Sequence, residues 1–168
     1  LESLDSWREE LAKNITNRNA DDGFTDEHIN YAVQNILDRI IFLRICEDRG
    51  VEPYGKLQKI SEEYTIYQKL LKYFYEADER YNSGLFRFKK DKNNPQTPVD
   101  DVTPKLILDD KVLKKIIKEL YYPESPYQFS EIPVEILGQA YEQFLGKVIR
   151  VTKGGICKIE EKPEVRKA

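Results

Sequence analysis

One set of residues has the composition of a metal-dependent nuclease site. Such sites combine an aspartate with a Glu-x-Lys pair, because carboxylates hold a divalent cation and the lysine stabilises a developing negative charge. Asp100 or Asp101 and the run Glu160-Glu161-Lys162 supply these residue types. They lie about 60 residues apart, however, and a chain in which 34 % of the residues are charged offers many accidental matches. Solvated surface charge is therefore the favoured interpretation, and a nuclease fragment is the alternative.

The other reactive side chains are few. The single histidine, His28, follows Glu27 in the first turn of an expected helix and is interpreted as a solvated helix residue. Cys46 lies in an apolar helical stretch and Cys157 in an expected hairpin, so nothing marks either as a nucleophile. The chain has no Cys-x-x-Cys or His-x-x-x-His pair and no glycine-rich phosphate loop. The sequence thus assigns no catalytic, cofactor-binding or metal-binding residue to this chain.

Basic residues gather at the C-terminal end. Residues 147–168 hold seven lysines and arginines against three glutamates, in a chain of net charge −3. Two apolar runs flank a Thr-Lys-Gly-Gly turn at 152–155, which predicts a β-hairpin. Basic side chains on a projecting ribbon suit contact with DNA phosphates, and the alternative is a solvated ribbon edge. The candidate DNA-backbone contacts are Lys147, Arg150, Lys153, Lys158, Arg166 and Lys167.

Helical periodicity dominates the rest of the chain and predicts a mainly α fold. Five helices are expected, with the longest, 26–49, at the centre because its second half is apolar nearly all round. The others are expected around residues 4–15, across 64–77, after Asp109 as N-cap, and over 133–146. We therefore expect a helical domain over residues 1–146, followed by the basic hairpin and tail over 147–168.

Loops and surface charge complete this outline. Pro53 and Gly55 predict a short loop before the third helix, and three prolines between 89 and 104 predict a surface loop. The helix after Asp109 carries four lysines on its outer face, which is typical of a solvated surface, with phosphate contact as the alternative. These lysines are Lys111, Lys114, Lys115 and Lys118.

One charged residue falls inside the apolar stripe of the central helix. Arg44 lies between the positions of Ile40 and Leu37 on the helical wheel, where a buried, unpaired charge would cost several kcal/mol. Glu47 and Asp48 follow it by three and four residues and can reach it on the same face. We expect a structural ion pair among these three residues.

Length and composition bound the class of protein. The 168 residues are 40 % hydrophobic, which suffices for the core of one domain, and the acidic balance excludes a uniformly basic nucleic-acid coat. No apolar run approaches the roughly 18 residues that span a membrane, and no signal-peptide pattern opens the chain. Two cysteines fit a reducing, cytoplasmic location, and the absence of methionine suggests a piece of a longer protein.

Four segments together resemble a known family. They are 37–50 (LDRIIFLRICEDRG), 77–86 (ADERYNSGLF), 125–129 with 132–146 (SPYQF and IPVEILGQAYEQFLG), and 162–167 (KPEVRK). This ordered set resembles the region between nuclease and methyltransferase in single-chain (type IIG) restriction–modification enzymes and in related adenine-specific DNA methylases.

The resemblance implies a helical connector that leads into a methyltransferase domain. The parent enzyme would methylate adenine N6 with S-adenosylmethionine, with or without a fused Mg²⁺-dependent nuclease. The motifs that carry this chemistry in the family are absent from this chain, so no cofactor is expected in this fragment. The expected partners are DNA, through the parent, and the neighbouring nuclease and methyltransferase domains, with no membrane.

A second function hypothesis is a protein-interaction module without DNA contact. The aromatic loop 121–129 and the tyrosine-rich third helix would form its contact face, and an uncovered face of this kind would give self-association.

Overall fold

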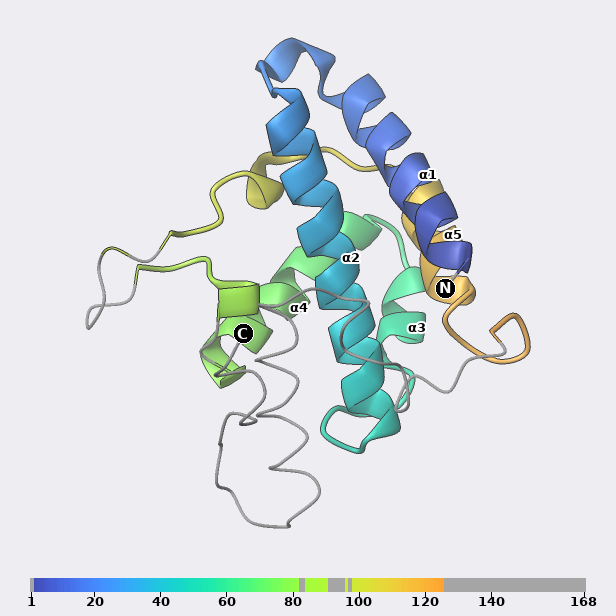
Figure 1. Ribbon diagram of the computed structural model, residues 1–168. Coiled ribbons are helices and arrows are strands. Elements are labelled where there is room, and N and C mark those ends of the chain that lie inside the picture. The colour runs from blue at the N-terminus through green and yellow to red at the C-terminus, as the bar shows by residue number, and fades with distance from the viewer. Residues whose placement is uncertain (1, 82–83, 91–95, 97, 126–168) are drawn as a thin grey trace.

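The fold is mainly helical, as the sequence predicts (Figure 1). The computed structural model describes residues 2–81, 84–90, 96 and 98–125. Within these residues it contains five α-helices, three short 3₁₀ turns and no strand. The expected helix over 133–146, the basic hairpin over 147–168 and the domain boundary between them lie outside the described residues. No described helix is both long enough and apolar enough to span a bilayer.

The first two helices form an antiparallel pair (Figure 1). Helix α1 spans Glu2–Arg18 and α2 spans Asp26–Asp48, and a 3₁₀ turn, Ala20–Asp22, lies between them. The apolar side chains of α1 at helical spacing are all buried, which explains why α1 lies along α2. They are Leu4, Trp7, Leu11 and Ile15.

Helix α2 is the centre of the fold. It begins with a capping box, in which the Thr25 hydroxyl accepts the His28 N–H at 3.2 Å and His28 Nδ1 accepts the Thr25 N–H at 3.1 Å. The single histidine is exposed on the helix, as expected, and also caps its N-terminus. From Ile36 to Glu47 every side chain of α2 is buried, because α1, α3 and the later segments cover it on several sides. Gly50, at φ 75°, follows the helix end.

The segment after α2 differs from the sequence prediction. Where we expected a loop and then one helix from residue 64, the structure has two helices, α3 (Lys56–Ser61) and α4 (Ile66–Tyr81). Gly55, at φ 86°, turns the chain into α3, and Leu57 anchors this short helix in the core. Tyr64, where we expected the third helix to begin, precedes α4 and is 85 % exposed.

Helix α5 (Asp110–Lys118) closes the core against α1, α3 and α4. Asp109 is its N-cap residue, as predicted, but its side chain makes no capping hydrogen bond. It accepts instead from Asn14 of α1 at 2.8 Å and pairs with Arg18 at 3.1 Å. Leu108 and Leu113 are both buried, as expected for a hydrophobic staple. The remaining short turns are η2 (Gly84–Phe86) and η3 (Thr103–Lys105).

Candidate functional site

The most distinctive feature of the described residues is a set of buried charged side chains on α2. Arg39 is 1 % exposed, and its Nη1 atom lies 2.7 Å from a carboxylate oxygen of Asp100. Its Nε atom donates to the Leu85 carbonyl at 2.7 Å and its Nη1 atom to the Thr103 hydroxyl at 3.1 Å. The guanidinium also lies 4.7 Å from the centre of the Phe88 ring. One side chain of α2 thereby holds both ends of the segment that runs from η2 to η3.

The Asp100 carboxylate is fully engaged in this contact. One oxygen accepts the Val102 and Thr103 N–H groups, each at 3.0 Å, and the other accepts from Arg39 and from the Thr103 hydroxyl. Both lone-pair regions that a metal ion would need are therefore occupied by protein donors. Asp100 serves the fold, and Asp101 beside it is exposed. Glu160 and Lys162 of the nuclease hypothesis lie outside the described residues.

Arg44, one turn and a half further along α2, holds the chain after α5. It forms an ion pair with Asp48 and donates from Nε to the Leu120 carbonyl at 2.9 Å. Its guanidinium packs over the rings of Tyr121 and Tyr54, at 4.4 and 5.2 Å from their centres. These contacts combine charge, hydrogen bonding and stacking, which only arginine offers in one side chain.

Glu47 has a different task from the one its spacing suggested. Its carboxylate accepts the Gly55 N–H at 2.7 Å, the Leu57 N–H at 3.2 Å and the Tyr121 hydroxyl at 2.6 Å. It thus caps the start of α3, whose first N–H groups would otherwise lack acceptors. Burial raises the pKa of Glu47, and the donated hydrogen bonds together with Arg44 oppose that rise.

A second buried carboxylate joins the end of α2 to α4. Glu52 is 3 % exposed and accepts the Tyr73 hydroxyl at 2.9 Å, with Arg80 and the Tyr81 hydroxyl as further donors. Burial acts to raise its pKa, but the bonds from Arg80, Tyr81 and Tyr73 outweigh burial, so the pKa of Glu52 lies below its usual value. The sequence analysis missed this group. The available signal was that Glu52 lies between two apolar helical stretches and that the second stretch carries hydrogen-bond donors two turns apart.

Asp38 is the least compensated of the buried acids. It is 9 % exposed, and Gln34 Nε2 donates to it at 2.8 Å. Burial raises its pKa from 3.8 to about 6, although the Gln34 bond, Arg8 and Arg39 oppose the rise. Since the described contacts give Asp38 no ion pair within 4 Å, its charge is a net cost to the fold at neutral pH.

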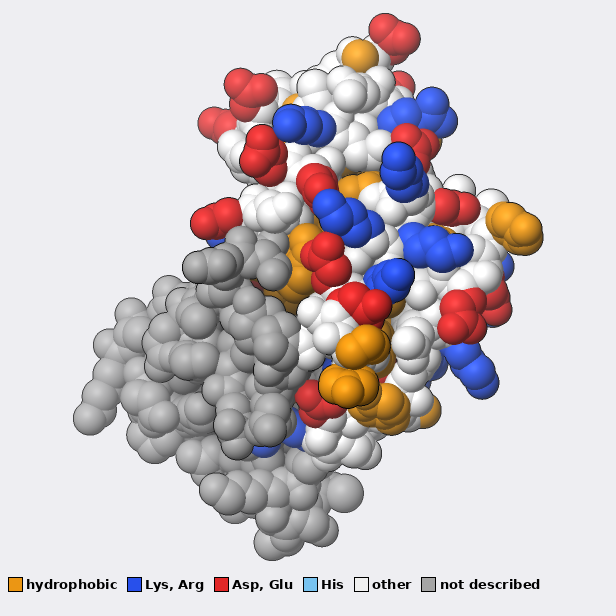
Figure 2. Space-filling model, turned by 90° about the vertical axis from the view of Figure 1, so that its right-hand side faces the viewer, with side chains coloured by type: hydrophobic (Ala, Val, Ile, Leu, Met, Phe, Trp, Pro, Cys, Tyr) orange, Lys and Arg blue, Asp and Glu red, His pale blue; other side chains and the backbone are white. Residues whose placement is uncertain are grey.

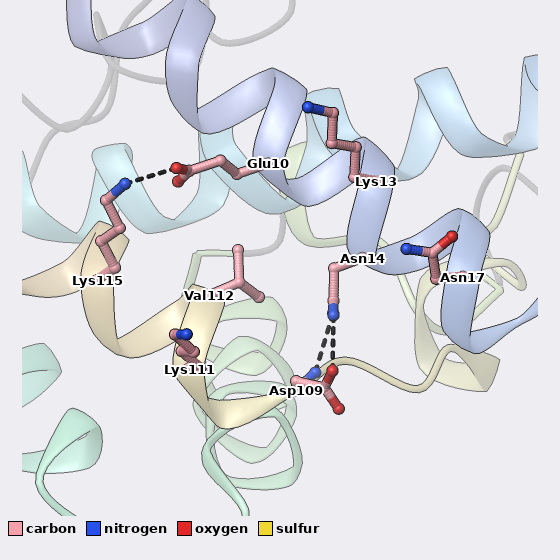
Figure 3. A pocket seen from close by; sticks show the side chains of 8 residues that line it. All are labelled: Glu10, Lys13, Asn14, Asn17, Asp109, Lys111, Val112 and Lys115. Atoms are coloured by element: carbon pink, nitrogen blue, oxygen red, sulfur yellow. Dashed lines mark hydrogen bonds and ion pairs between the residues drawn. The ribbon is translucent and has the colours of Figure 1, made fainter.

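A hollow of about 480 Å³ lies between α1 and α5 (Figure 3). Three lysines border it, Lys13 from α1 and Lys111 and Lys115 from α5. The two carboxylates at its edge are already paired, Glu10 with Lys115 and Asp109 with Asn14 and Arg18. Figure 2 shows the side of the molecule that carries these helices, with lysines and arginines over its middle among scattered acids.

The described residues offer little for covalent or metal chemistry. No group of three or more histidine, cysteine or carboxylate side chains within them is placed to hold a metal ion. Cys46 is buried, and burial raises the pKa of its thiol, so the thiolate needed for nucleophilic attack is suppressed.

The predicted DNA-contact residues between Lys147 and Lys167 lie outside the described residues, so the structure places none of them. Of the aromatic loop proposed as a protein-contact face, residues 121–125 are described. Tyr121 is buried against Arg44, whereas Tyr122 is 85 % exposed. On α4, Tyr67 and Tyr73 point inward and are 2 % exposed, which leaves Tyr75 as the more accessible tyrosine of that helix, at 40 %.

Comparison with known proteins gives a relative that covers almost the whole chain. The chain is 33 % identical over 164 residues, 98 % of its length, to the type II restriction enzyme and methyltransferase RM.Eco57I of Escherichia coli. It spans 15 % of the length of that protein. No family model and no solved structure matches the chain. The similarity is thus to one segment of a much longer restriction–modification enzyme.

Proposed function

We propose that this chain is the helical connector of a restriction–modification enzyme. The observation that carries the proposal is the similarity to RM.Eco57I along 98 % of the chain, which follows one segment of a much longer protein. The buried charges of α2 support a mechanical role, because Arg39, Arg44 and Glu47 each fasten a different segment by directional bonds. Such directional bonds hold these segments in one fixed arrangement around α2.

In this proposal the parent enzyme methylates adenine N6, with S-adenosylmethionine supplying the methyl group. A nuclease, where the parent carries one, would use Mg²⁺ and would be held by the connector at a fixed distance from the methyltransferase. The partners of the connector are those two domains and the DNA on which they act. Its own share of DNA contact is assigned to the basic residues from Lys147 to Lys167, through phosphate charges and without sequence preference.

The scaffold role is tested in a full-length enzyme that carries this region and has both activities. Substituting Arg39→Met loosens the connector, so cut positions should spread over several base pairs while the methylated base stays the same. The matched control is Lys72→Glu, an exposed change on α4 that touches no core contact. Limited proteolysis first shows whether the Arg39→Met connector is loosened. If it is loosened and the enzyme still cuts DNA at one unchanged position, the scaffold role is refuted.

The DNA part is tested with the chain itself and a short fluorescent duplex. We expect salt-sensitive binding with little sequence preference, weakened by Arg150→Glu with Lys153→Glu. Binding that is unaffected by this double charge reversal would remove the C-terminal basic residues from the proposal.

A second candidate, a protein-contact module, is favoured by one observation. Tyr54 and Tyr122 are 65 % and 85 % exposed, and both adjoin the buried Tyr121, Tyr54 by ring contact at 5.9 Å and Tyr122 as the next residue in the chain. A face of this kind would give concentration-dependent association, which sedimentation velocity detects and Tyr54→Ser with Tyr122→Ser should abolish. A monomer at all concentrations would argue against it.

A further inference from the structure

The outer face of α5 carries a row of lysines. Leu113, Ile116 and Ile117 turn inward and are fully buried, which fixes the rotation of the helix and places the basic side chains outside. Lysines three and four residues apart on such a helix lie on neighbouring turns, with their Cβ atoms about 5–6 Å apart. The exposed side chains of this row are Lys111, Lys114, Lys115 and Lys118.

The hollow between α1 and α5 adjoins this lysine row and adds polar side chains of α1 to the surface. Lys13 borders the hollow from α1, although its ammonium points away from α5 and pairs with Glu9 at 3.2 Å, and the exposed Asn17 lies further along the same helix (Figure 3). Amide and ammonium groups are the donors that proteins use on phosphate oxygens. At about 480 Å³ the hollow is wide enough for a phosphate group with its water.

The local charge pairing leaves two lysines available. Lys115 is paired with Glu10, and Lys118 lies 3.9 Å from Glu124. Lys111 and Lys114 make no ion pair among the described residues, so a bound anion would not have to displace a carboxylate from either. At the rim, Asp109 is held by Asn14 and Arg18, and Glu10 is paired with Lys115 through one oxygen while its other, buried oxygen has no hydrogen-bond partner. The paired cations reduce the repulsion that these acids exert on a phosphate.

We propose that the α5 lysine row and the adjoining hollow bind the phosphate backbone of duplex DNA. The choice of DNA as partner rests on the proposed function, whereas the surface is a different one from the C-terminal basic residues. Lys111 and Lys114 supply the free charges, and Lys13 and Asn17 border the hollow. The surface reads charge and shape rather than sequence, so it positions DNA along the connector.

The test is fluorescence anisotropy of the whole chain with a short duplex at several salt concentrations. Lys111→Glu with Lys114→Glu should weaken binding at least about tenfold and lower the slope of log affinity against log salt by about two. The matched control is Lys72→Glu with Lys90→Glu, which makes the same change in net charge at exposed positions with no described ion pair. Binding by the control should stay within about threefold of the parent. Lys111→Gln with Lys114→Gln repeats the test with charges removed rather than reversed, should the glutamate variant fail to fold.

Each outcome decides the inference. Weakening by the α5 variants and not by the control supports it, whatever Arg150→Glu with Lys153→Glu does. Weakening by the latter pair alone overturns it and leaves the proposed function standing. Equal weakening by the α5 variants and the control means that net charge alone acts, which also overturns it. No binding even at low salt overturns both the inference and the assignment of DNA contact to residues 147–167.

Discussion

Removing the Arg39 guanidinium should be among the most damaging single changes in this protein. Arg39→Met keeps an apolar side chain of similar length in the core but leaves the Asp100 carboxylate, 2 % exposed, without its cation. It also leaves the Leu85 carbonyl without the donor that lies 2.7 Å away. The substitution therefore strands one buried charge and one buried acceptor at once.

The size of the loss follows from these two groups. Breaking a buried ion pair from one side costs about 3–5 kcal/mol, because the remaining charge stays desolvated. The Thr103 hydroxyl and two backbone N–H groups still bind Asp100, which keeps the loss near the lower end of that range. A protein with roughly 5–15 kcal/mol of total stability would lose about a third of it. At a loss of about 3 kcal/mol, the melting temperature should fall by roughly 6–12 °C.

The assay is a double-mutant cycle measured by urea unfolding with far-UV circular dichroism. Arg39→Met, Asp100→Asn and the double variant are compared with the parent chain. Asparagine keeps an oxygen for the Val102 and Thr103 N–H groups but carries no charge, so the double variant strands no ion. The double variant should be more stable than the sum of the single losses predicts, by about 1–3 kcal/mol.

Two results would refute this reasoning. Single losses below about 1 kcal/mol would mean that Asp100 is solvated in the folded chain. Losses that add within about 0.5 kcal/mol would mean that the two side chains act independently.

Three further predictions use the same unfolding assay. Arg44→Ala should lower the free energy of unfolding by about 2–4 kcal/mol, and Arg44→Lys should recover only part of it, since lysine cannot stack and donate together. Asp38→Asn should raise the free energy of unfolding at pH 7.5 by up to about 3 kcal/mol, because a carboxyl whose pKa is about 6 when folded and 3.8 when unfolded destabilises the fold increasingly above about pH 4 and fully above about pH 6. That gain should vanish as the pH falls below 4, where both states bind the proton, and a gain that persists there would contradict it. Thr25→Ala should cost about 1 kcal/mol, whereas His28→Gln should be nearly neutral because glutamine also fills the third position of a capping box. Equal losses for these two variants would refute the reciprocal cap.

The sequence predicts those elements whose signals are local. The central helix, expected over 26–49, is found over Asp26–Asp48, because its apolar stripe, the Thr25 cap and Gly50 all lie within it or directly beside it. The boundary between α3 and α4 was not found. The start of α4 is capped by Asp110, whose carboxylate accepts the Thr65 and Ile66 N–H groups at 3.1 and 2.8 Å from 45 and 44 residues away. A sequence pattern read over a few neighbouring residues cannot reveal a helix cap whose donor and acceptor lie this far apart.

The buried charges divide in the same way. Arg44 stood out because it interrupts an apolar stripe and has Asp48 one turn away, and the structure holds that ion pair. Arg39 interrupts the same apolar run, but its partner Asp100 lies 61 positions later in a stretch whose prolines and acids are typical of a surface loop. Glu47 was grouped with Arg44 by helical spacing, but its hydrogen bonds come from the Tyr121 hydroxyl and from two backbone N–H groups at the start of the next helix. Helical spacing therefore identifies reachable partners but does not choose among them.

The arrangement of these charges on α2 bears on what the domain is for. Apolar packing alone tolerates sliding of one helix on another, because it is non-directional. Arg39, Arg44 and Glu47 prevent such sliding at three levels of α2, and each one fixes a segment that follows much later in the chain or begins the next helix. Each of them also carries a desolvation cost that an apolar residue of similar volume would avoid. Replacing apolar residues by buried charges adds little to stability. It benefits a protein whose function requires its segments to keep fixed relative positions.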